Sequence, residues 1–225
     1  MAYGGAQDGL AGTAETEAWR ELVAELAGDL PIEFLMAWIR RESDGNACSY
    51  TSAHESGLFQ LMPPDNTNVA GTTEAELRTA CSGSSQHLAR PFTDDENRTN
   101  ITKQLVYVNH CREVAHEKLS AAGVDWDDET DPDFWKFVKL QHAYPSPTAG
   151  WLAAAAAELG RPAASWDEFA SFVPSHASGV MRNAAAVGGA ADPSSTLSKI
   201  GTVIVMLVLV VGACYLASRG DFPAV

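Results

Sequence analysis

The stretch that decides the fold is PIEFLMAWIRRES, residues 31–43, followed after a polar segment by SGLFQLMP, residues 56–63. Apolar residues at helical spacing predict an amphipathic helix over the first run. Pro31 stands in its first turn, where the missing N–H matters little. The breaker cluster SDGN, residues 43–46, predicts the end of this helix. Glu42 is therefore expected in the last turn, on the apolar face.

Two properties of this position favour a protonated carboxyl at Glu42. A carboxylate among apolar neighbours is poorly hydrated when ionised, and the negative end of the helix dipole disfavours a second negative charge, so both raise its pKa. A general acid that protonates a glycosidic oxygen needs such a pKa. Replacing Glu42 by Gln would then change stability little. The alternative is that Glu42 leans into solvent or pairs with Arg41.

Two motifs in this region are similar to those of the soluble lytic transglycosylases, a family of the lysozyme-like superfamily. One is a helix that ends in Glu-Ser, here Glu42 and Ser43, and the other is Gly-Leu-Phe-Gln-Leu-Met-Pro, here residues 57–63. The chain departs from the family pattern at Glu55, since relatives have a small residue there. This departure argues against Glu55 as the acid.

Two later segments resemble the same family more weakly. DENRTNITKQLVYV, residues 95–108, looks like the family's Asn-Ile helix, within a long helix expected up to about residue 123. LQHAYPSPTAG, residues 140–150, places Tyr144 at the family's cleft tyrosine, although Pro145 replaces the Asn that usually follows. The segment before it, DPDFWKFVKLQHAY, predicts a further helix that begins at Asp-Pro.

The resemblance implies a lysozyme-like catalytic domain that cleaves the β-1,4 bond between N-acetylmuramic acid and N-acetylglucosamine in peptidoglycan. Glu42 would protonate the leaving oxygen and then, once ionised, take the proton of the muramoyl 6-hydroxyl, which attacks to give a 1,6-anhydro end. Ser43, Gly57, Gln60 and Tyr144 would bind or orient the substrate. This chemistry implies neither metal nor cofactor, and the sequence has no C-x-x-C or H-E-x-x-H spacing.

Two other functions stay open. A hydrolytic muramidase would use Glu42 as the acid, with Glu55 or Asp44 positioning the water, although a solvated loop charge is the expected role of Glu55. A structural or glycan-binding protein would have lost the activity. Nucleic-acid binding is disfavoured, because the 225-residue chain has a net charge of −14.

The expected fold class is mainly α, with a small β element in the loop of residues 50–65. Residues 1–12, rich in Gly and Ala, predict a loose N-terminus, and the domain would span residues 13–180. Residues 181–198 predict a flexible linker, because Ala, Gly, Ser and Pro dominate there. Any disulfide would pair two of three cysteines in the domain, and the pairing stays open: Cys48, Cys81 and Cys111.

Residues 199–219 are expected to form one transmembrane helix, and residues 220–225 a short tail. The eighteen residues from Ile200 to Ala217 carry no charge. As a helix they would span about 27 Å, close to the thickness of about 30 Å of the hydrocarbon core. Charges bracket the segment at both ends, as membrane anchors do.

The start of the chain lacks the basic and apolar regions of a secretory signal. A wall enzyme anchored by a C-terminal helix would then be separated from its substrate. The sequence therefore predicts a bacteriophage virion protein that opens the wall at the host envelope during genome entry. Its partners would be peptidoglycan, a membrane and other virion or ejection proteins. The alternative is a secretion- or conjugation-associated wall enzyme exported by another route.

Overall fold

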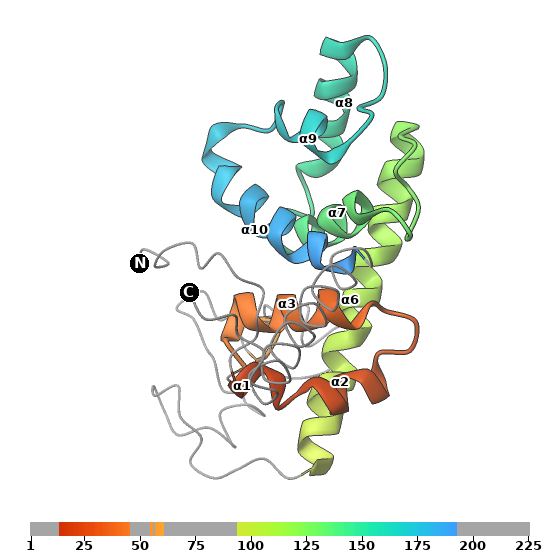
Figure 1. Cartoon of the computed structure of the whole chain (residues 1–225). Helices are drawn as coiled ribbons and strands as arrows, with labels where there is room; N and C mark the ends of the chain where they lie inside the picture. The colour runs from red at the N-terminus through yellow and green to blue at the C-terminus, as the bar shows by residue number, and fades with distance from the viewer. Residues whose placement is uncertain (1–13, 46–54, 56, 61–93, 193–225) are drawn as a thin grey trace, which may run out of the picture. The chain divides into compact units, whose positions relative to one another are not determined.

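The computed structural model describes residues 14–45, 55, 57–60 and 94–192. Helices make up the regular structure of these ranges, and no strand occurs within them (Figure 1). The prediction of a mainly α fold is confirmed. Residues 57–60 form a turn, and except for Glu55 the rest of the loop of residues 50–65, where a small β element was expected, lies outside the described residues.

The predicted architecture, in which a transmembrane helix follows the catalytic domain, is corrected. Within the ranges that the structure describes, no helix combines the length and the apolar character needed to cross a bilayer. The expected span, residues 199–219, lies outside the described residues, as do the expected loose start, residues 1–12, and the tail, residues 220–225.

The described helices belong to one compact unit that ends at Ala191. Their bounds are α1 Ala14–Glu17, α2 Arg20–Leu26, α3 Ile32–Ser43, α6 Asp94–Ala122, α7 Pro132–Ala143, α8 Thr148–Leu159, α9 Trp166–Ala170, the short 3₁₀ helix η2 Ser175–Ala177, α10 Ser178–Gly188 and the 3₁₀ helix η3 Gly189–Ala191. Helices α3, α6 and α7 lie where the sequence predicts them. Asp131 caps α7 by accepting a hydrogen bond from the Asp133 N–H.

The core around the site is built from aromatic side chains of α3 and α7. Phe34 on α3 packs on Trp135 of α7, with ring centroids 4.9 Å apart. One turn later on α3, Trp38 contacts the ring of Phe59 at 5.7 Å. All four rings are buried. Such rings bury large apolar areas, so they fix the relative position of α3, α7 and the 57–60 turn.

Helix α10 replaces much of the predicted linker. Residues 178–188 form a regular helix that lies beside α7 (Figure 1). Met181, Ala184 and Val187 recur at helical spacing and are buried in the core. The Ala- and Gly-rich composition that predicted a linker is instead the composition of a closely packed helix.

The close approach of α10 to α7 depends on Gly188. A Cβ atom at this position would overlap the backbone of Trp135 and Lys136. The Gly188→Ala variant is therefore expected to lose about 1–3 kcal/mol of unfolding free energy, because overpacking forces the helices apart. Urea unfolding measures the loss. Gly179→Ala, on the same helix with open space around it, is the control and should lose none; an equal effect of both variants would contradict the packing argument.

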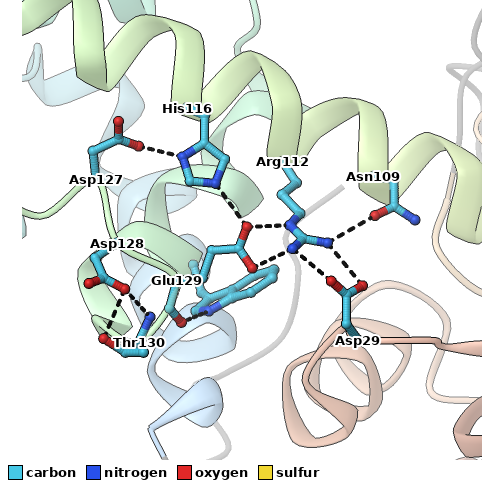
Figure 2. A network of polar contacts seen from close by, with 9 residues as sticks. Asp29, Asn109, Arg112, His116, Asp127, Asp128, Glu129 and Thr130 are labelled. Carbon is cyan, nitrogen blue, oxygen red and sulfur yellow. Dashed lines mark hydrogen bonds and ion pairs between the residues drawn. The ribbon is translucent and has the colours of Figure 1, made fainter.

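A charged network joins α6 to two loops at its side (Figure 2). The guanidinium of Arg112 on α6 makes two hydrogen bonds to Glu129 at 2.6 and 2.5 Å, and two to Asp29 at 3.0 and 2.9 Å. His116, one turn further along α6, contacts Asp127 at 2.6 Å and Glu129 at 2.9 Å. Because Glu129 precedes α7, this network fixes α7 against α6.

The network makes stability depend on pH. Burial opposes the charged ring of His116, but its contacts with Glu129 and Asp127 outweigh this and raise its pKa above 6.5. Burial also opposes ionisation of Glu129, yet Arg112 and His116 lower its pKa below 4.5. The stabilisation from His116 is complete below pH 6.5 and lost as pH rises through its folded pKa. That from Glu129 is present above pH 4.5 and lost as pH falls.

We therefore expect the network to stabilise the fold most between pH 4.5 and 6.5. Urea unfolding of the wild type and of His116→Gln at several pH values measures this. The difference between the two proteins should be largest inside the window and shrink above it. His176→Gln, at an exposed histidine, is the control. A difference that stays constant across pH 5–9 would show that the charge of His116 is not involved.

Candidate active site

The candidate site lies at the end of α3, where Glu42 stands. Glu42 is the second-last residue of the helix, and Asp44 ends it in the left-handed conformation with φ +52°. The Glu42 side chain is 19% exposed, so it is neither fully enclosed nor free in solvent. Ser43 is buried and donates its hydroxyl to the carbonyl of Ile39, within the helix.

Lys139 of α7 is the direct partner of Glu42. Its Nζ lies 2.6 Å from Glu42 Oε1, and its side chain is only 2% exposed. The same Nζ stands 4.3 Å from the ring centroid of Trp38, a cation–π contact. From α10, Asn183 Nδ2 donates a longer hydrogen bond of 3.5 Å to the same Glu42 oxygen. Three helices thus meet at one carboxylate oxygen.

The pKa of Glu42 differs from the sequence expectation. Burial does raise it, as predicted, but the charge of Lys139 and the hydrogen bonds from Lys139 and Asn183 outweigh burial and lower it below 4.5. The prediction of a carboxyl held protonated near neutral pH is therefore wrong. At rest Glu42 is an ionised carboxylate in a buried ion pair, and its partner is Lys139 instead of Arg41.

His142 lies one turn after Lys139 on α7. Burial first, and then the charge of Lys139, lower its pKa to about 3, although Glu42 acts in the opposite direction. Its ring packs against Trp38 with centroids 5.2 Å apart. Its Nδ1 atom is enclosed and makes no hydrogen bond with another described residue. His142 is thus a neutral ring near neutral pH.

Residues 57–60, the described part of the second motif, fold as a turn against α3. Trp38 Nε1 donates to the carbonyl of Phe59 at 3.3 Å, and Gln104 of α6 accepts from the Phe59 N–H at 2.9 Å. Gly57 adopts φ +80°, and a Cβ there would lie 3.0 Å from the Gln104 amide nitrogen. Glycine is therefore favoured at this position both by the left-handed backbone and by the closeness of Gln104. The Gln60 amide is buried and donates to the Gly57 carbonyl at 2.7 Å.

The structure brings the two motifs together but separates some predicted site residues. Tyr144 ends α7 and is half-buried, with its ring 5.5 Å from that of Trp151 on α8. None of the hydrogen bonds found between described residues joins Tyr144 to Glu42. Ser43 Oγ and Gln60 Nε2 donate hydrogen bonds to backbone carbonyls inside the fold. Glu42 presents a partly exposed carboxylate at this site.

Glu55, the predicted second carboxylate, is half-buried beside the 57–60 turn. Its charge acts on Lys139 in the same sense as that of Glu42, favouring the ammonium form. The charges of both carboxylates, Glu42 and Glu55, therefore act on the same lysine. No group of three or more His, Cys, Asp or Glu side chains in the described ranges is arranged to hold a metal ion.

Two residues of the site were missed from the sequence. Lys139 stands four residues after Trp135 and three before His142, so helical spacing places it on the buried face of α7. That spacing was a usable signal, because a lysine on an apolar face needs a counter-ion. Asn183 gave no such signal, since it lies in the segment that composition assigned to a linker.

Comparison of the chain with protein-family models, with curated proteins and with solved structures finds no match. The resemblance to the lytic transglycosylases therefore depends on the motif residues of this sequence.

Proposed function

We propose that this protein cleaves the glycan strands of peptidoglycan, with Glu42 as the group that transfers the proton at the glycosidic bond. The observation that carries the proposal is the setting of Glu42. Glu42 lies in the last turn of α3, and its side chain is 19% exposed. Lys139 donates a hydrogen bond to one of its carboxylate oxygens. The turn of the second motif packs on the same helix through Trp38 and Phe59. A fixed carboxylate of this kind can take a proton from a sugar hydroxyl.

Because the pKa of Glu42 is lowered, one of its two proton transfers is easier than the other near neutral pH. The ionised carboxylate is ready to remove the proton from the muramoyl 6-hydroxyl, which is the base step. The acid step, protonation of the leaving oxygen, needs a proton on Glu42 first. Because Glu42 has a pKa below 4.5, this step is favoured as the pH falls.

The products formed from purified peptidoglycan test the proposal. A lytic transglycosylase leaves 1,6-anhydro-muramoyl ends, which mass spectrometry of the released fragments detects. Release of such ends by the purified protein is the expected result. Release of no fragments would contradict cleavage and would favour a glycan-binding protein whose Glu42 serves only as the partner of Lys139.

A hydrolytic muramidase is the second candidate, and the position of Glu55 favours it. A second carboxylate whose charge reaches the same lysine as Glu42 could orient a water molecule. Hydrolysis would leave reducing muramic acid ends in place of anhydro ends. The same product analysis therefore separates the two enzymes.

The virion-borne setting predicted from the sequence stays a prediction. It depends on residues 1–13 and 193–225, which lie outside the described residues.

A further inference from the structure

Lys139 has a role that the family resemblance does not assign, and the inference drawn from it rests on the proposed function. The side chain is 2% exposed, so its ammonium cannot touch a glycan strand. Its Nζ donates to Glu42 Oε1 at 2.6 Å. Asn183 donates to the same oxygen at 3.5 Å. Any effect of Lys139 on a sugar must therefore pass through the Glu42 carboxylate.

Burying the Lys139 ammonium costs free energy of hydration, so its position beside Glu42 calls for a functional reason. An ammonium ion removed from water loses several kcal/mol of hydration, and only a well-placed counter-ion with further contacts offsets the loss. Lys139 has such contacts in the Glu42 carboxylate and the face of the Trp38 ring. An apolar residue would fill this part of α7 at lower energetic cost. The lysine instead fixes one oxygen of the proposed acid and base.

Charged and titratable groups face Lys139 from several elements. Burial lowers the pKa of the Lys139 ammonium below 10.5, whereas Glu42 on α3, Cys111 on α6 and Glu55 beside the 57–60 turn act in the opposite direction. His142, on its own helix, is neutral above a pKa of about 3. Asn183 on α10 carries no charge. Glu42 is the titratable group in direct contact with the Lys139 ammonium.

We propose that Lys139 is a positioning residue for Glu42, which fixes Oε1 of the carboxylate with Asn183 as a second donor and sets the pH range in which Glu42 can carry a proton. Without the ammonium, the hydrogen bond from Asn183 would be left to oppose burial, and burial favours the protonated acid. The lysine thus holds the site in the ionised, base-ready form near neutral pH, and acidification converts it to the acid form.

The Lys139→Met variant tests the proposal through the pH profile of kcat/KM for glycan cleavage. In the wild type, activity that needs protonated Glu42 falls as the pH rises through the Glu42 pKa. In the variant this fall is expected at higher pH. The kcat value at the optimum is expected to drop, by up to about 10²-fold, because Oε1 is no longer held. KM should change little, since Lys139 does not contact the substrate.

Lys136→Met is the matched control, because it makes the same change on the same helix. Lys136 pairs with Asp133, 2.6 Å away, and does not contact Glu42. Its pH profile should equal that of the wild type. A profile of Lys139→Met that also equals the wild type would overturn the proposal.

Asn183→Ala gives a second reading if Lys139→Met fails to fold. This variant keeps the ion pair and removes only the longer hydrogen bond to Oε1. The pH at which activity falls should move in the same direction as in Lys139→Met, by a smaller amount. A move to lower pH, or none, would contradict the role given to the donors around Oε1.

A titration that needs no activity separates this inference from the proposed function. The carboxyl carbon of Glu42, labelled with ¹³C and assigned with Glu42→Gln, can be followed by NMR in the wild type and in Lys139→Met or Asn183→Ala. Titration at higher pH in the variants supports the positioning role even if the protein cleaves no glycan. An unchanged titration would overturn the role even in an active enzyme.

Discussion

Replacing Glu42 by Gln is expected to reduce the rate of glycan cleavage by about 10²–10⁴-fold, the usual contribution of a general acid and base. Gln has nearly the same shape but can neither give nor take the proton. The rate of clearing of purified peptidoglycan, measured at several pH values, gives the size of the loss. Clearing by the variant at the wild-type rate would show that Glu42 is not the proton-transfer group.

Glu55→Gln is the matched control for this experiment, since it makes the same change at a carboxylate that influences the same lysine. It should retain most of the activity if one carboxylate performs both proton transfers. A loss as large as that of Glu42→Gln would instead identify a two-carboxylate hydrolase. Circular dichroism of each variant checks that the loss of activity is not a loss of folded protein.

The second large effect concerns stability. Glu42→Gln should lower the unfolding free energy by about 3–5 kcal/mol, because it leaves the Lys139 ammonium buried without its counter-ion. This reverses the expectation from the sequence, in which Glu42 was a destabilised carboxyl that Gln could replace at little cost. Urea unfolding at pH 7 of the single variant measures the loss.

The double variant Glu42→Gln with Lys139→Met shows whether the ion pair causes this loss. With both charges removed, much of the stability should return, because no unpaired charge stays buried. A double variant no more stable than Glu42→Gln alone would contradict the explanation.

The pH dependence gives an independent check on the same pair. Since the folded-state pKa of Glu42 is lowered, its stabilisation is present above pH 4.5 and is lost as the pH falls through that pKa. The wild type and Glu42→Gln should therefore differ most near neutral pH and converge in acid.

The parts of the fold that follow from local patterns could be predicted from the sequence. The apolar spacing of residues 31–43 and the breakers after it located α3 and its end. Asp131 and Pro132 located the start of α7 in the same way. The two motifs of the resemblance meet in the structure through the bond from Trp38 to the Phe59 carbonyl.

The partners of Glu42 could not be predicted in the same way, because they depend on tertiary packing. Burial was correctly expected to raise the pKa of Glu42. The direction of the net pKa shift, however, is determined by Lys139, which lies 97 positions away in the sequence. Helix α10 was missed because its interface with α7 uses glycine and alanine, such as Gly188 and Ala184. Composition alone cannot distinguish such a helix from a flexible linker.

The contribution of α10 to the site has a consequence for folding while the protein is being synthesised on the ribosome. Glu42 and Asn183 are 141 positions apart, and the helix that carries Asn183 is the last α-helix described in its compact unit. A nascent chain that has exposed α3, α6 and α7 still lacks one donor to the proposed catalytic oxygen. The complete set of donors around Glu42 therefore assembles only when synthesis has passed α10, so an unfinished chain does not carry a finished site.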